Sequence, residues 1–572
     1  MKKVQYIFGA LALITIPNWV QAQTQAKDTT LSRTVVVEQE YNPDIIDASK
    51  VNVLPKVMPP TVSKKTVEYD ATLAPAGNIP ATTMEAYTGA ESQDKAKRGY
   101  ARLGYGNYGN LDARANYLFI LPNSDKLNLN FHMNGMDGKL DLPDSKDKWD
   151  ARYYRTHAGM DYVHAFRKMD LNVAGNFGLS NFNFLPGSVN SKQKFTSGDF
   201  HAGIHFIDET APLRFNAETN LLMYERQHNM ISENDANTAI KETIIRTKGD
   251  VTGAINDQQS VTIALEMNNL LYSGYTKTPS TGDEYFKNYT TLLVNPYYEL
   301  NNDDWKLHIG ANVDLSFGFD KSFRISPDVT AQYIFSDSYI VYAKATGGKQ
   351  LNDFRRLESL CPYGDSYFST TSAESSNRRP YDTYEQLNAS LGLKASPYPG
   401  IWFQLFGGYQ NLKNDLLYSY SSLSDTSIGT VSTMLAFTQI HTDNVYAGIK
   451  LTYDYKDVLS LSAHYIYRNW NSDNNEYLLT VKPENEASIS LNVHPTSALQ
   501  LNAGFDYISR KEEATSFNMS DISDLHIGAS YNVFKRVSVY AQVHNLLNKK
   551  YQYYLGYPAE GFNFLGGLSF RF

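Results

Sequence analysis

The feature of this sequence that most constrains its fold is an alternation of apolar and polar residues. The alternation recurs in segments of about 10 residues from Arg98 to the C-terminus. In the last segment the apolar positions are Phe562, Phe564, Leu568, Phe570 and Phe572. A period of two residues is that of a strand with one apolar and one polar face. Such strands need another sheet or a lipid phase to cover their apolar faces.

The connections between these segments alternate between short and long. Ten short turns lie at 121–125, 167–168, 208–212, 256–259, 301–304, 337–338, 396–400, 456–457, 494–497 and 535–536. Eleven other connections, mostly longer, lie at 108–109, 137–151, 180–197, 225–242, 273–287, 319–322, 349–382, 421–430, 471–484, 511–520 and 553–560. Short turns on one side and long loops on the other are typical of an outer-membrane barrel. We therefore predict an all-β fold, a transmembrane antiparallel β-barrel of about 22 strands.

Composition agrees with a barrel and excludes several other classes. The chain has 42 tyrosines, which suit the aromatic girdles at the two membrane interfaces. Its single cysteine, Cys361, excludes an intrachain disulfide and a four-thiolate metal site. A net charge of −8 gives no footprint for nucleic acid. A large secreted β-sandwich or propeller is the alternative, and the apolar final strand ending at Phe572 argues against it.

The N-terminal region has a different composition. Lys2 and Lys3 precede an apolar stretch, Ile7 to Val20, so we predict a signal peptide at 1–22 with cleavage after Ala22. A retained membrane anchor is the alternative. Residues 23–97 are rich in proline and poor in aromatics, and we expect a short non-globular arm that is periplasmic or inserted in the lumen. The barrel is then assigned to 98–572.

The C-terminal residues resemble a known family. The run Val543 to Tyr551, the loop Gly556 to Gly561 and the strand Phe562 to Phe572 are similar to the last two strands of TonB-dependent outer-membrane receptors. The resemblance implies a barrel in the outer membrane of a Gram-negative cell, used for uptake of a solute. It also implies lipid contact, barrel-assembly machinery that recognises the C-terminal Phe570 and Phe572, and a TonB-type energy transducer or a surface lipoprotein as partner.

The sequence departs from that family before the first strand. The 75 residues of 23–97 are too few for the globular plug that such receptors carry, and a barrel of this size is too wide to be filled by its own side chains. Three segments or molecules are candidates for closing it: the arm, the loop 349–382 folded inward, or a separate protein. Lumen-facing charges that would pair with an inserted segment, or form only a solvated wall, are Arg102, Asp112, Arg114, Glu266, Arg468, Asp506, Arg510 and Arg571.

Two segments are candidate binding sites. The strand Thr34, Val35, Val36 and Val37 lies where the family keeps its TonB box, which pairs with the transducer by strand addition; a local structural strand is the alternative. The loop 349–382 mixes aromatic and charged residues, which suits a ligand or a surface partner as well as a solvated cap. Its candidate binding residues are Phe354, Arg355, Arg356, Tyr363, Tyr367, Phe368, Arg378, Arg379 and Tyr381.

Enzymatic chemistry is not indicated. The sequence has no Gly-x-Ser-x-Gly elbow and no His-Glu-x-x-His motif, and Cys361 is expected to be inert. His201 and His205 share a strand face but have no third ligand nearby in sequence, so we predict no metal and no cofactor. We expect a non-enzymatic barrel for passage of a solute. The alternative is a scaffold subunit of an outer-membrane assembly through which nothing passes.

Overall fold

Antiparallel strands dominate the structure. The computed structural model describes residues 97–572 except 123–124, 143–145, 187–190, 209–210, 229–238, 275–285, 337, 369–378, 425–430, 474–475 and 513–518; of 366–368, 421–424 and 431–434 it describes the backbone alone. The strands on the N-terminal side are β1 (Gly99–Gly106), β2 (Leu111–Ile120), β3 (Lys126–Asp141), β4 (Lys148–Ala165), β5 (Met169–Asn183), β6 (Lys192–Phe206), β7 (Leu213–Arg226), β8 (Ile240–Asn256), β9 (Gln259–Gly274), β10 (Tyr289–Asn301), β11 (Trp305–Phe317), β12 (Phe323–Phe335) and β13 (Tyr339–Gln350).

The C-terminal half continues the same series. Its strands are β14 (Gly364–Phe368), β15 (Thr383–Tyr398), β16 (Ile401–Ser424), β17 (Val431–Tyr455), β18 (Leu459–Ser472), β19 (Pro483–Val493), β20 (Leu499–Arg510), β21 (Ile522–Phe534), β22 (Val537–His544), β23 (Gln552–Tyr554), β24 (Tyr557–Pro558) and β25 (Asn563–Arg571). Short helices are η1 (Asn107–Gly109), α2 (Phe354–Leu360) and η3 (Glu476–Val481). No helix in the described ranges is long and apolar enough to cross a bilayer.

The sheet closes on itself. β1 pairs with β2 along one edge and with β25 along the other, so that Leu103 faces Ala113 on one side and Leu568 on the other. Of the 23 strands in this sheet, β14 is a short parallel addition within a loop, and the other 22 form the wall. Closure pairs the backbone groups of both edge strands, which a barrel in lipid requires. The predicted fold and strand number are confirmed.

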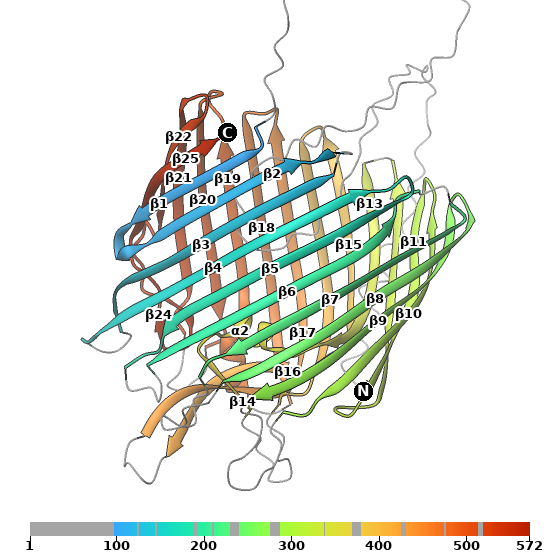
Figure 1. Ribbon diagram of the computed structural model, residues 1–572, viewed down its shortest axis with the longest axis horizontal. Helices are drawn as coiled ribbons and strands as arrows, with labels where there is room; N and C mark the ends of the chain where they lie inside the picture. The colour runs from blue at the N-terminus through green and yellow to red at the C-terminus, as the bar shows by residue number, and fades with distance from the viewer. Residues whose placement is uncertain are drawn as a thin grey trace, which may run out of the picture. The chain divides into compact units, whose positions relative to one another are not determined.

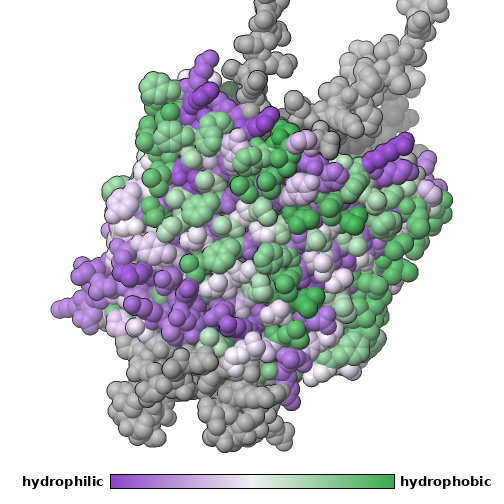
Figure 2. Space-filling view, in the orientation of Figure 1, coloured by the Kyte–Doolittle hydropathy of each residue, from purple (hydrophilic) through white to green (hydrophobic). Residues whose placement is uncertain are grey.

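Alternate residues point to opposite sides of this wall. Leu103, Phe564 and Leu568 are 59%, 49% and 45% exposed on the outside, whereas Ser569 is only 6% exposed. Figure 2 shows apolar residues over much of one face of the wall, with hydrophilic residues gathered at the outer ends of β3 and β4. The outer face is therefore a lipid-facing surface, and the protein is a multi-pass barrel of an outer membrane.

Most strands are longer than predicted. We expected about 10 residues each, but β16 and β17 have 24 and 25 residues. A tilted strand needs about 9 to 11 residues to cross a bilayer, so the remaining length extends beyond it. The β16–β17 pairing slips between Leu412 and Asp415, where Asn414 has a φ of 53°. This bulge bends the outer part of the hairpin.

The two ends of the barrel differ in their connections. The C-terminus and the short turns lie at one end, at the top of Figure 1, and α2, β14 and the β16–β17 hairpin lie at the other. By the convention of such barrels the short-turn end faces the periplasm and the long-loop end faces outside. The predicted signal peptide and arm lie outside the described residues.

Candidate functional site

Hydrogen bonds join the two ends of the connection between β13 and β15. The Asn352 side chain donates to the Tyr381 carbonyl at 2.6 Å and to Thr383 Oγ1 at 3.1 Å. The backbone N–H of Asn352 donates to Asp382 Oδ1 at 3.1 Å. Asp382 in turn accepts from the hydroxyl of Tyr289 on β10, at 3.0 and 2.9 Å. These bonds hold the two ends of the loop together and against the barrel wall.

A short helix, α2, begins directly after the N-terminal end of this connection. Asp353 is its N-cap and accepts from the Arg356 backbone N–H at 2.9 Å. Phe354 and Leu357, three positions apart, fall on one face and are buried. Burial raises the pKa of Asp353, against the lowering effect of its bond from Arg356.

The apolar face of α2 packs on the inside of the wall. The Phe354 ring lies 5.7 to 5.9 Å from the rings of Tyr224, Tyr272 and Phe286, and its backbone N–H donates to Glu242 Oε1 at 2.9 Å. Phe354 is 2% exposed. The inward position of α2 is therefore set by strands β7, β8 and β9 (Figure 1).

Polar bonds extend this attachment to β4, β5 and β7. The Glu358 carboxylate accepts from Ser180 Oγ at 2.9 Å and from the Tyr224 hydroxyl at 2.7 Å, and Arg155 lies 3.5 Å away. Because Ser180 and Tyr224 are buried, loss of Glu358 leaves both hydroxyl groups without this acceptor.

Arg379 lies near the C-terminal end of the loop, just before β15, and is buried there. Its guanidinium pairs with Asp382 at 3.3 Å and lies over the rings of Tyr289 and Phe319, 3.9 and 5.2 Å from their centroids. It is 2% exposed. This arginine holds the loop closed and has no surface left for a ligand from outside.

The loop then reaches the opposite wall. Strand β14 pairs in parallel with β17, with Gly364 opposite Leu435, and Tyr363 stacks on Tyr557 at 3.6 Å. The Gly364 carbonyl accepts from Arg226 on β7 at 2.7 Å. β5 and β17 are 11 strands apart in a ring of 22, so they stand on opposite sides of it. The loop contacts β5 through Glu358 and β17 through β14, so it crosses the lumen.

The result is a packed core inside the outer mouth. One cluster joins buried residues of β3 to β10, the loop, the β16–β17 hairpin and the β22–β25 connection. Its largest contributors are Trp149, Phe182, Phe184, Phe195, Phe286, Phe354, Tyr363, Tyr418, Phe437 and Tyr557. A barrel wall alone has no such core, because inward residues of a wide barrel face water. Among the described residues, those of the loop lie inside the lumen, whereas the arm lies outside the described part of the chain.

The remaining predicted loop residues have separate environments. Arg355 bonds to Asp199 at 3.5 Å and to the Gly198 carbonyl at 3.1 Å. Burial lowers the pKa of Arg356, which faces Asp415. Tyr381 is 41% exposed and stacks on Phe319 at 5.0 Å. Tyr367 and Phe368 lie on β14 with side chains outside the described atoms, and Arg378 lies outside the described residues.

Cys361 ends α2 inside this core. The thiol is 1% exposed, and burial raises its pKa to about 12. A protonated, enclosed thiol is a poor nucleophile. Cys361 is a free thiol in the structure.

The predicted lumen charges bond mainly to neighbouring strands. Asp112 bridges Arg102 at 2.9 Å and Arg114 at 3.1 Å. The other contacts are Glu266 to Arg246 at 3.6 Å, Arg468 to Glu486 at 3.3 Å, Asp506 to His526 at 3.6 Å, and Arg510 to the Ser520 carbonyl at 3.2 Å. Arg571 lies opposite Tyr100, on the inward-facing side with Ser569. Most of these lumen charges therefore have partners within the barrel wall itself.

No local pattern in the sequence indicates the residues that receive the loop. Glu242, Tyr224 and Tyr289 lie on the wall, between 90 and 134 positions from the loop residues they bind. A local signal exists only for α2, where Asp353 precedes a run of helix-forming residues. The candidate TonB-box strand, Thr34 to Val37, lies outside the described residues.

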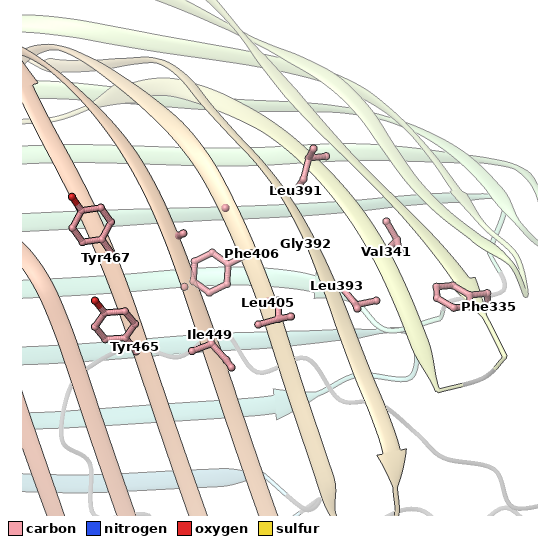
Figure 3. Close-up of a pocket in the computed structure, with 13 residues that line it drawn as sticks. Phe335, Val341, Leu391, Gly392, Leu393, Leu405, Phe406, Ile449, Tyr465 and Tyr467 are labelled. Carbon is pink, nitrogen blue, oxygen red and sulfur yellow. The ribbon is translucent and has the colours of Figure 1, made fainter. Parts of the chain in front are cut away.

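A shallow hollow on the barrel wall is not a solute site. Figure 3 shows that Leu391, Leu405, Ile449 and Tyr465 from neighbouring strands line it. These side chains are 42% to 67% exposed on the lipid-facing side. The hollow is therefore part of the surface that contacts lipid acyl chains.

Comparisons with known proteins agree with the barrel geometry. No model of a protein family matches the sequence, and curated protein sequences give no match. Among solved structures, the copper transporter OprC is 13% identical, with a TM-score of 0.60 over 83% of this chain and 80% of its own. The siderophore receptor PirA from Pseudomonas aeruginosa is also 13% identical, with a TM-score of 0.58 over 83% and 80%.

A third similar structure is the ferric-catecholate import receptor Fiu from K12 E. coli. It is 12% identical, with a TM-score of 0.60 over 83% of this chain and 82% of its own. By their descriptions these three are a transporter and two receptors. The likeness to TonB-dependent receptors that the C-terminal strands predicted is confirmed at the level of the barrel fold.

Proposed function

We propose that this protein is a non-enzymatic outer-membrane passage for a solute, and that its loop 351–382 is the gate at the outer mouth. The observation that carries the proposal is the attachment of α2 to the inside of the wall through Phe354 and Glu358. Receptors of similar fold import metal complexes, and uptake of a scarce solute is the activity that this likeness favours.

The same proposal includes partners. A TonB-type transducer would bind the strand Thr34 to Val37 by β-addition, and pulling on it would supply energy for opening. Barrel-assembly machinery would recognise Phe570 and Phe572. A surface lipoprotein would contact the outer loops.

One observation favours a second candidate function. A packed core lies in the outer mouth, and such a core also suits a scaffold subunit that transports nothing. The two functions differ in the effect of releasing the loop, because only a passage then becomes permeable.

The test is outer-membrane permeability in cells that express the full chain. The variant Phe354→Ala/Glu358→Ala removes both attachments of α2, and we expect sensitivity to a bulky hydrophilic antibiotic such as vancomycin to rise at least tenfold. Ser359→Ala is the matched control, since Ser359 is the exposed residue of the same helix. If the double variant reaches the membrane in normal amount and the cells stay resistant, the scaffold function is favoured and the passage is contradicted.

A further inference from the structure

Two histidines on β6 converge on the space above a glycine. His201, Gly203 and His205 occupy alternate positions of the strand and point into the lumen, since Phe200 and Ile204, at the other positions, are exposed on the lipid side. A Cβ atom at Gly203 would lie 3.1 Å from the Nε2 atoms of both histidines. Both imidazoles therefore lean toward the same point, which only a glycine leaves free.

The neighbouring strand supplies a carboxylate at that point. Glu218 on β7 lies directly opposite Gly203, and its Cβ is 3.4 Å from the same position. One ligand atom from each of His201, His205 and Glu218 lies within 4.8 Å of the other two. Ligands of one zinc ion stand about 3.4 Å apart when the metal–ligand bonds are about 2.1 Å, so small side-chain rotations complete the site.

The surrounding groups leave these ligands available. Within the part of the chain that the structure describes, neither imidazole makes a hydrogen bond or an ion pair. Glu218 Oε1 lies 3.3 Å from Lys248 Nζ, which also lies 3.8 Å from Glu266. Asp170, opposite His205 on β5, has a buried Oδ1 with no hydrogen-bond partner among the described atoms. Two imidazoles without another bond, beside a buried carboxylate oxygen of Asp170 that lacks a partner, favour a cation.

A second cluster, Asp524 with His526 and His544, is less available. The Asn545 N–H donates to Asp524 Oδ1 at 2.5 Å, and His544 Nδ1 lies 3.6 Å from Asp524 Oδ2. His526 Nδ1 faces Asp506 at 3.6 Å. All three members of this cluster thus have a hydrogen-bond or ion-pair partner, whereas in the first cluster only Glu218 has one among the described residues.

We propose that His201, His205 and Glu218 form a binding site for a divalent transition-metal ion of the zinc class in the lumen. Two imidazoles and one carboxylate are a ligand set that Zn²⁺ prefers, and three protein ligands leave a fourth position open toward the lumen. The site lies near the periplasmic end, since β6 ends at Phe206. It is distinct from the loop core at the outer mouth and does not depend on the passage function.

The test is Zn²⁺ binding to the purified full chain in detergent, by titration calorimetry, with the absorption spectrum of bound Co²⁺ as a second readout. The wild type is expected to bind one more equivalent than His201→Ala/His205→Ala. Glu218→Gln keeps the size of the side chain and is expected to weaken binding at least tenfold. His464→Ala, on the inward face of β18, is the control and is expected to bind as the wild type does.

A steric variant tests the geometry separately from the ligands. Gly203→Val keeps all three ligands and fills the space on which they converge, so affinity is expected to fall at least tenfold while the heat-modifiable gel mobility of the barrel stays normal. Equal Zn²⁺ stoichiometry and equal Co²⁺ spectra in the wild type and in His201→Ala/His205→Ala would overturn the proposal. So would full affinity in Gly203→Val.

Discussion

At the scale of single residues, the reactivity of Cys361 reports whether the loop is closed or open. The thiol is 1% exposed in the core of the outer mouth, and its pKa is about 12. Maleimide therefore reacts with it only when the loop opens. In intact outer membranes we predict that wild-type Cys361 is labelled at least 100-fold more slowly than in urea-unfolded protein. Labelling at the rate of an exposed thiol would show that the loop does not rest inside the barrel.

Asp353 gives the loop a dependence on pH. Burial raises its pKa above the ordinary value of 3.8, so the closed loop retains a proton that an open, solvated loop releases. The relevant pH range begins at about 3.8, where Asp353 of the open loop ionises, and ends at the raised pKa of the closed loop. Closure is therefore favoured at the acidic side of this range and weakens as pH rises through it. Cys361 labelling is predicted to accelerate with rising pH over this range, after correction for thiol ionisation.

Two substitutions separate the charge of Asp353 from its cap. Asp353→Asn keeps the N-cap acceptor without the charge and is predicted to reduce the pH dependence. The part that comes from Glu242 remains, because burial raises the pKa of that carboxyl group to about 8 and it accepts from the Phe354 N–H. Asp353→Ala loses the bond to the Arg356 N–H and is predicted to destabilise closure by about 1 kcal/mol, a fivefold faster labelling. If the two variants behave alike at every pH, the cap does not contribute.

At the scale of elements, packing of α2 on the wall is the contact that we expect to hold the loop inside the barrel. Phe354→Ala removes a ring enclosed by three aromatic residues, and such core truncations cost about 3 to 5 kcal/mol. We predict at least 100-fold faster Cys361 labelling in this variant, measured beside Ser359→Ala as the unaffected control. A change below threefold would mean that the loop is held by other contacts.

The seam between β1 and β25 is the second critical element. The Phe572 carbonyl accepts from the Arg98 and Gly99 N–H groups at 3.0 and 2.7 Å, and its ring stacks on Tyr117 at 5.8 Å. Deleting Phe572 is predicted to reduce the folded, heat-modifiable barrel several-fold. Arg571→Ala keeps the backbone of the same strand and serves as the control. Equal yields from both variants would contradict a role of the C-terminal ring in closure or assembly.

At the scale of the whole molecule, the wall could be predicted from the sequence because lipid imposes the period-two pattern on each strand. The alternation of apolar and polar residues from Phe562 to Phe572 shows that pattern locally, and short turns such as 167–168 mark where the strands end. The closed mouth could not be predicted in this way. It depends on bonds such as Glu358 to Ser180, across 178 residues of sequence, which no local pattern encodes.

The same limit applies to the candidate metal site. His201 and His205 are visible as a pair in the sequence, but Glu218 joins them only through the register between β6 and β7. Gly203 is an ordinary strand residue by its sequence, and its importance depends on the direction of both imidazoles. Cross-strand neighbours thus decide the chemistry of this part of the lumen.

The most direct measurement is single-channel conductance of the purified mature protein in a planar bilayer. The mature chain and a chain lacking residues 24–96 are both predicted to be closed, because the loop packs across the lumen against the β16–β17 hairpin and the β22–β25 connection. Adding Phe354→Ala/Glu358→Ala to either chain is predicted to give large, discrete openings. A steady, large conductance from the chain that lacks 24–96 but keeps the loop intact would contradict this account.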